Sequence, residues 1–177
     1  MPAGALMPHL RIQLHPHFSR ISHKKYHGVR LFHYETNEMT IASDLLQQHI
    51  QTLVDDNARW QTLIADDILW VLPYAPAIGH PARLSGREEV VHHVTWFVGA
   101  VENFRFFDIK VYAFVDPEAA VAEFKAEGRI KPTGRIYLQD YVLFLRAAGG
   151  KIAFLREYFN PVHVAKALDT PILGLTS

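Results

Sequence analysis

Two β-rich runs decide the fold: Gly134-Arg-Ile-Tyr-Leu-Gln-Asp-Tyr-Val-Leu-Phe-Leu-Arg146 and Lys151-Ile-Ala-Phe-Leu-Arg-Glu-Tyr-Phe-Asn160. Both are rich in branched and aromatic residues, and Pro161 follows the second run. The sequence between them, Ala147-Ala-Gly-Gly150, is typical of a turn. Two such runs around a glycine-containing loop predict an antiparallel β-hairpin.

The position of the turn sets which side chains of this hairpin share a face. If Ala147 and Gly150 flank the turn, Asp140 lies opposite Glu157. A slip by two residues keeps both acids on one face, whereas a slip by one separates them, because strand side chains alternate with a period of two. Like charges directly opposite each other destabilise a sheet, so the pair suggests a functional site. The other residues predicted on that face are apolar: Ile136, Leu138, Val142, Phe144, Ala153, Leu155 and Phe159.

The opposite face of the hairpin carries aromatic rings with a few polar groups. It includes Tyr137, Tyr141, Arg156 and Tyr158. Such a mixture is typical of a protein–protein contact rather than of a solvated surface. We therefore expect a homodimer that forms through this outer face of the sheet.

Composition excludes several classes of protein. The chain has 177 residues, a length that fits one domain, and its formal net charge is zero. It contains no cysteine, which rules out disulfides, thiol nucleophiles and thiolate metal sites. No apolar run approaches the length of a membrane span. We expect a cytoplasmic protein that binds neither nucleic acid nor membrane.

Residues 1–38 differ from the remainder of the chain. They carry five Lys or Arg, two Glu and six of the eleven histidines. They show no sustained helical or strand period, which predicts a poorly ordered head. A targeting segment and a native start at Met39 remain open alternatives, and residues 39–177 are expected to form a single domain.

The order of predicted elements indicates the fold class. Helices are expected from Ser43-Asp44 to about Val54, over residues 59–65 and over residues 87–101, with a strand at residues 68–74 between the second and third. Four strands follow, and a short helix begins at Pro161. Early helices and a late antiparallel run predict an α+β domain, in which a bent, cone-shaped antiparallel sheet wraps over the N-terminal helices. The hollow of such a half-barrel is the default ligand site.

The third predicted helix supplies a histidine for that hollow. His93 recurs with Val90, Val94 and Phe97 at helical spacing, so these residues share one face. His92 lies nearer the edge of that face, and an assignment to His92 stays open. A histidine on an apolar face is often only a buried core residue. Opposite Asp140 and Glu157, however, an imidazole provides a proton relay at neutral pH.

Several blocks of the sequence together resemble the SnoaL-like branch of the NTF2-like, or ketosteroid-isomerase-like, superfamily. The resemblance covers about residues 43–168. The blocks occur in the family's order: Ala65-Asp-Asp-Ile-Leu-Trp70, Pro73-Tyr-Ala-Pro76, Gly86 at a helix start, Glu127-Gly128, Thr133-Gly134-Arg135 with Tyr137, Gly150-Lys-Ile152 and Arg156-Glu-Tyr-Phe-Asn-Pro161. The resemblance implies the half-barrel fold and leaves the activity open, because this fold hosts many functions.

Within that superfamily the final block is similar to the ending of the phenazine-biosynthesis A/B proteins. In those proteins a cavity histidine and the glutamate of this block act as the acid/base pair in the condensation of two amino-ketones. The resemblance therefore implies Glu157 and His93 as the corresponding residues here.

We expect acid/base chemistry on a small cyclic or carbonyl compound, of the isomerase or cyclase type, without a metal or cofactor. Glu157, Asp140 and His93 are the predicted catalytic residues. The residues expected to contact the substrate are Trp60, Tyr74, Val90, Phe97, Leu138, Val142, Phe144, Leu155 and Phe159.

Three alternatives remain open. The first is phenazine-type condensation, with Arg59 or Arg83 holding an acidic substrate. The second is a non-catalytic, dimeric small-molecule-binding module. In the third, Glu157 is only a structural ion-pair partner of Arg135 or Arg156.

Overall fold

The computed structural model describes residues 21–26, 29–34 and 39–174. The chain divides into two units, Met1–Glu38 and Met39–Ser177. In the first unit, β1 (Ile21–Tyr26) and β2 (Val29–Tyr34) pair as an antiparallel hairpin, which the sequence analysis did not predict. The expectations of poor order and of targeting for the rest of the head fall on residues outside the described ones.

The second unit combines helices with one sheet. Its elements are α1 (Ile41–Thr52), α2 (Asn57–Leu63), β3 (Ile64–Val71), the 3-10 helix η1 (Ala75–Ile78), β4 (Arg83–Ser85), α3 (Arg87–Ala100), β5 (Val101–Ala113), β6 (Ala119–Ile130), β7 (Ile136–Ala148), β8 (Lys151–Tyr158) and α4 (Pro161–Leu168). None of the helices within the described ranges is long and apolar enough to cross a membrane.

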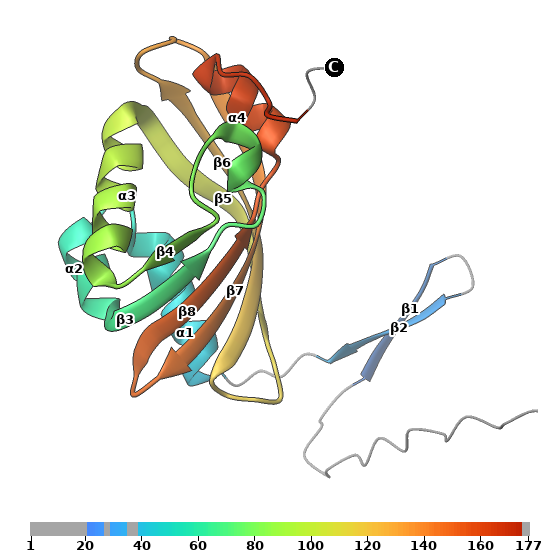
Figure 1. Ribbon diagram of the computed structural model, residues 1–177. Coiled ribbons are helices and arrows are strands. Elements are labelled where there is room, and N and C mark those ends of the chain that lie inside the picture. The colour runs from blue at the N-terminus through green and yellow to red at the C-terminus, as the bar shows by residue number, and fades with distance from the viewer. Residues whose placement is uncertain (1–20, 27–28, 35–38, 175–177) are drawn as a thin grey trace, which may run out of the picture. The chain divides into compact units, whose positions relative to one another are not determined.

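The six strands of this unit form one curved sheet, in the order β4-β3-β8-β7-β6-β5 (Figure 1). Helix α1 contacts β5, β6, β7 and β8, and α3 contacts β3 and β5, so these helices pack on the sheet. The predicted α+β fold is confirmed. The sheet is mixed rather than wholly antiparallel, because β3 runs parallel to β8.

Capping residues set the ends of the helices. Thr40 and Ser43 form a capping box at α1, in which each backbone N–H donates to the other side chain's hydroxyl. The N-cap is therefore Thr40, three residues before the predicted cap at Ser43. At α4 the Asn160 side chain accepts from the N–H of Val162, and Pro161 occupies the first turn, where its missing N–H costs nothing.

A bulge in β8 decides which side chains of the hairpin face the core. Next to the turn Ala148 pairs with Lys151, and Gly149 and Gly150 have the positive φ angles that a tight two-residue turn requires. This register differs from the predicted one by two residues, so it preserves the predicted faces. Further along, Ala147 pairs with Ile152 but Arg146 pairs with Phe154, which leaves Ala153 as an extra residue. One extra residue reverses every later face.

The predicted placement of the acid pair is therefore wrong. Glu157 pairs with Leu143 and points inward, whereas Asp140 pairs with Lys125 of β6 and is exposed on the outer face. The faces of β7 are the reverse of those predicted. Ile136, Leu138, Val142 and Phe144 point outward, and Tyr137 and Tyr141, which were assigned to the dimer face, are buried inside.

Irregular backbone in β5 adds to the curvature of the sheet. Its pairing with β6 shifts register between Glu102 and Arg105 and again between Phe107 and Lys110. Asn103 and Asp108 lie in these gaps with φ of 52° and 56°. Such bulges bend a strand and increase its twist, and they curve this end of the sheet around the helices.

We predict that Gly128→Ala destabilises the protein. A Cβ at this position would lie 2.6 Å from Cγ1 of Val101 and 3.1 Å from Cδ2 of Phe104. Both residues are buried, so we expect a loss of roughly 1–3 kcal/mol in the free energy of unfolding. Gly99→Ala is the matched control, because a Cβ in this last turn of α3 meets nothing within 4 Å. Urea denaturation checks both variants, and an unchanged midpoint for Gly128→Ala would contradict the close approach of β5 and β6.

Candidate functional site

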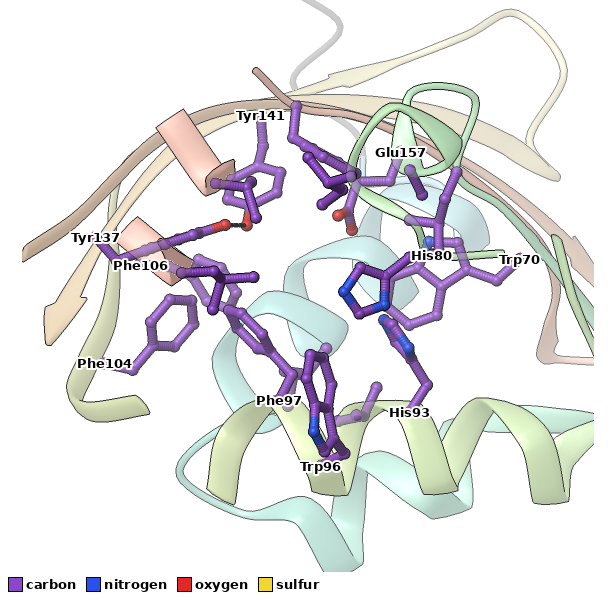
Figure 2. Close-up of a pocket in the computed structure, with 18 of the residues that line it drawn as sticks. Trp70, His80, His93, Trp96, Phe97, Phe104, Phe106, Tyr137, Tyr141 and Glu157 are labelled. Atoms are coloured by element: carbon purple, nitrogen blue, oxygen red, sulfur yellow. Dashed lines mark hydrogen bonds between the residues drawn. The ribbon is translucent and has the colours of Figure 1, made fainter. Parts of the chain in front are cut away.

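A cavity of about 100 Å³ lies between the inner face of the sheet and the helices (Figure 2). Its wall is largely aromatic and includes Trp70, Trp96, Phe97, Phe104, Phe106 and Phe124. The polar side chains that reach it are His49, His80, His93, Tyr137, Tyr141 and Glu157. No Lys or Arg lines this cavity in the described part of the chain.

Of the residues that the structure describes, Glu157 alone places a carboxyl group on the cavity wall. Strand β8 directs it inward, and its carboxyl group points into the cavity (Figure 2). The residue retains partial exposure because it opens on the cavity, but its surroundings are apolar. Among the described residues, no hydrogen bond or salt bridge reaches this carboxyl. Burial alone raises the pKa of Glu157 from 4.5 to about 8, so the group is mostly protonated at neutral pH.

Two buried tyrosines provide a hydroxyl pair on the same wall. The Tyr137 and Tyr141 hydroxyl oxygens are 2.5 Å apart, and both side chains line the cavity (Figure 2). Burial raises the pKa of both phenols, so each keeps its proton. One of these protons forms the bond between the oxygens, which leaves the other available to a ligand acceptor.

The sequence analysis did not include this tyrosine pair in the site, although the sequence holds a signal for it. Tyr137 and Tyr141 alternate in phase with Leu143 and Leu145, and this face of β7 carries no charge. The other face carries Asp140. A charge on one face and none on the other favours the uncharged face as the buried one.

His49 of α1 forms part of the cavity wall and is neutral. Its Nδ1 accepts a hydrogen bond of 3.0 Å from Nε1 of Trp60, inside the core. Burial lowers the pKa of His49 to about 3. Its single proton therefore resides on Nε2 at neutral pH. The sequence analysis did not include His49 in the site.

Two further histidines lie toward the more exposed end of the cavity. The ring of His93 is 6.5 Å from that of Trp70 and 5.9 Å from that of Trp96, and the ring of His80 is 5.2 Å from Trp96. Burial lowers the pKa of His93, and the nearby His80 and His92 lower it further. His92 is exposed, so the structure places His93, rather than His92, on the cavity wall.

The structure brings only part of the predicted set together. Four predicted residues line the cavity: Glu157, His93, Phe97 and Phe159. Three are buried in the core without lining it: Trp60, Val90 and Leu155. Four face outward from β7: Leu138, Asp140, Val142 and Phe144. Tyr74 is also exposed, with its ring 5.7 Å from that of Tyr158.

The described residues also bear on metal binding and on ion pairing. No group of three or more His, Asp or Glu side chains among them could hold a metal ion. Arg135 pairs with Asp169 rather than with Glu157, and Arg156 points outward over the ring of Phe154. These contacts do not support Glu157 as a structural ion-pair partner.

Comparisons with known proteins agree with this fold. Residues 46–155 match the model of the SnoaL-like domain. The chain is 32% identical over 128 residues to an uncharacterized PhzA/B-like protein of Pseudomonas aeruginosa, covering 72% of this chain and 89% of that one.

Two solved structures are similar in fold. The phenazine biosynthesis-related protein PhzB2 of P. aeruginosa is 22% identical, with a TM-score of 0.64 over 77% of this chain and 85% of that one. A Catenulispora acidiphila protein with a ketosteroid isomerase-like fold, in complex with trimethylamine, is 21% identical. Its TM-score is 0.59 over 72% of this chain and 94% of that one.

We predict that Glu157 makes stability fall as the pH rises. The folded protein keeps a proton that the unfolded chain loses above pH 4.5, so stability declines from there until about pH 8 and then levels off. At about 1.36 kcal/mol per pKa unit, the upper bound on this loss of unfolding free energy is roughly 5 kcal/mol. Partial access of solvent to the carboxyl group through the cavity reduces the expected loss to roughly 2–3 kcal/mol.

Glu157→Gln removes this loss, so we expect the variant to exceed the native protein in stability at pH 9 and to match it near pH 4.5. The lowered pKa of His49 makes stability fall as the pH drops below 6.5, and this effect is the same in both proteins. Thermal unfolding across pH is the measurement. Parallel curves for the two proteins would show that Glu157 ionises normally.

Proposed function

Because the chain belongs to the SnoaL-like family, within an isomerase- and cyclase-type superfamily, we propose that it is an acid/base enzyme that acts on a small carbonyl compound without a cofactor. One observation carries this proposal. Glu157 is an unpaired carboxyl in an apolar cavity, and its pKa is raised to about 8. A group with a pKa close to the working pH both gives and takes protons efficiently.

The cavity supplies the two groups that this chemistry needs. Ionised Glu157 takes a proton from the carbon next to a carbonyl group, and the free hydroxyl proton of the tyrosine pair donates to the carbonyl oxygen, where charge develops. If the substrate has a C=C bond beside this carbon, the resulting dienolate is reprotonated at its far carbon by Glu157, which is isomerisation. If the enolate instead attacks a second carbonyl, the new alkoxide takes the proton held by Glu157, which is cyclisation. Phe97 and Phe106 pack against the ring of the substrate.

The charge of the cavity favours an uncharged substrate. Lys and Arg are missing from its wall in the described ranges, so a carboxylate would find no cation there. Arg59 is exposed and donates to Gln48, and Arg83 is exposed on β4. Neither supplies the anchor expected for an acidic substrate, so phenazine-type condensation is the weaker proposal.

The size of the cavity favours a small substrate. Its volume is about 100 Å³. An engineered apolar cavity of about 150 Å³ binds benzene. A single ring therefore fills the enclosed part, and a larger substrate extends past Trp96, which is 44% exposed.

A second candidate is binding without catalysis. Aromatic walls with one carboxyl and no cation also suit a small ammonium ion, which stacks on aromatic faces and ionises the acid. The similar structure from C. acidiphila is a complex with trimethylamine. Titration of this chain with trimethylamine tests the candidate, because ammonium binding releases the proton of Glu157 and would be lost in Glu157→Gln.

We also propose a homodimer through the outer face of the sheet, in which Arg156 and Tyr158 stay from the set first assigned and the buried Tyr137 and Tyr141 are replaced. The exposed apolar side chains there are Ile136, Leu138 and Phe144 on β7 and Tyr112 on β5. Arg156 and Tyr158 of β8 lie on the same face. Charges of both signs surround the apolar side chains, for example Lys125 beside Asp140, so the face is complementary to a second copy of itself.

We predict that Glu157→Gln abolishes proton abstraction. Hydrogen–deuterium exchange next to the carbonyl of 2-cyclohexenone and similar cyclic ketones, followed by NMR in D2O, measures that step without requiring the native substrate. We expect the exchange rate to fall by roughly 100-fold or more, which is the usual contribution of a positioned base.

Asp140→Asn is the matched control, because Asp140 lies on the outer face and should leave the exchange rate unchanged. An equal loss in both variants would contradict the assignment of Glu157 as the base. Binding of these ketones without exchange would favour the second candidate.

We predict that Leu138→Glu converts the dimer into a monomer. Leu138 is 53% exposed, so the change puts charge into the proposed contact without disturbing the core. Ile41→Glu is the control, since Ile41 is 56% exposed at the start of α1, away from this face. Light scattering after size-exclusion chromatography checks both variants, and a native protein that is monomeric at micromolar concentration would contradict the dimer.

A further inference from the structure

One buried side-chain donor has no acceptor. Of the buried side-chain nitrogen and oxygen atoms in the described ranges, only Nε1 of Trp70 makes no hydrogen bond. Trp70 is 4% exposed, and its indole lines the cavity. Because buried donors are nearly always paired, an unpaired one requires an explanation. The other buried indole shows the usual case, as Nε1 of Trp60 donates to His49.

The sheet register brings the unpaired donor next to the unpaired acid. On the parallel strands β3 and β8, Trp70 lies opposite Leu155 and Val71 lies opposite Arg156. Glu157 is two residues beyond Leu155, so it points to the same face as Trp70, and both side chains line the cavity. Strand spacing and rise place such diagonal neighbours about 8 Å apart at the backbone. An indole and a glutamate are long enough to close that separation.

We propose that Trp70 is a positioning residue for Glu157, whose carboxylate accepts a hydrogen bond from the indole N–H once the acid has given up its proton. The proposal rests on the proposed function for its catalytic meaning. In the structure the acid extends into the cavity and the indole is unpaired, which is the arrangement expected of the protonated state (Figure 2). After proton transfer to the substrate, the carboxylate needs a donor, and a rotation about its side-chain bonds brings it to Trp70.

The other groups around Glu157 leave this role to Trp70. His49 of α1, His80 after η1 and His93 of α3 are the histidines that reach the cavity. Burial keeps His49 and His93 neutral at neutral pH, so neither offers a cation to the carboxylate. The free proton of the Tyr137–Tyr141 pair on β7 is the donor assigned to the substrate oxygen. Among the fully buried side-chain atoms of the described ranges, the indole N–H is the donor that has no partner.

The first experiment needs no change at Trp70. The chain has three tryptophans, so the protein labelled with 15N gives three indole N–H signals. We expect one of them to move downfield as pH rises, with the same midpoint as the 13C signal of the Glu157 carboxyl, and this movement to be absent from Glu157→Gln. If no indole signal follows the carboxyl, or if the movement persists in Glu157→Gln, the proposal is overturned.

The second experiment removes the donor. In Trp70→Phe, the ring is kept and the N–H is lost, so the ionised acid loses a partner and its titration midpoint should rise by about one pH unit. Trp96→Phe is the matched control, because it alters another aromatic wall residue and should leave the midpoint in place. An unchanged midpoint in Trp70→Phe, or an equal rise in Trp96→Phe, contradicts the role of Trp70. Both experiments are equilibrium measurements, so their outcome is separate from whether the protein turns over a ketone.

Discussion

The extra residue at Ala153 is the constraint on which the site depends. It adds one residue to β8 between Ile152 and Phe154. Beyond it, the alternation of inward and outward side chains is therefore the reverse of that expected from the turn, and Glu157 lies in this reversed part. Without the bulge, Glu157 would share a face of the hairpin with Asp140 instead of with Tyr137 and Tyr141. With it, the uncharged face of β7 packs inward beside a single acid. A local irregularity thus sets the composition of the whole cavity.

The cavity that results is governed by desolvation rather than by charge pairing. No Lys or Arg from the described part of the chain lines the cavity beside the acid, and burial keeps His49, His93 and the two phenols neutral. At neutral pH these side chains and Glu157 are therefore close to uncharged, and most of them are donors. This environment suits a neutral substrate that carries an oxygen acceptor, and it lets one carboxyl serve as both acid and base.

Much of the fold was predictable from the sequence, and the site only in part. Helix α3 and the strands around it follow from hydrophobic period, and the start of α4 follows from Asn160 and Pro161. His93 and Phe97 reach the cavity because a regular helix preserves the spacing read from the sequence. Asp140 and Phe144 do not reach it, because the alternation of side chains predicts which residues of a hairpin share a face only while the strand pairing is regular.

The bulge itself leaves little trace in the sequence, since Ala153 is an ordinary residue for a strand. What the sequence does contain is the contrast between the two faces of β7, of which one is charged and the other is not. Weighing that contrast above the predicted turn position would have placed Tyr137 and Tyr141 inside. The partner of Trp70 depends on a parallel contact between strands far apart in the chain, which local patterns do not reveal.

The central claim is that Glu157 is held protonated near neutral pH by burial alone. Infrared difference spectroscopy of the native protein against Glu157→Gln measures this directly, because a protonated carboxyl has a carbonyl stretch that a carboxylate lacks. The account predicts that band at pH 6.5, its disappearance by pH 9.5 and its absence from the variant. A native protein without the band at pH 6.5 would show that Glu157 is already ionised, and the proposed proton chemistry would lose its basis.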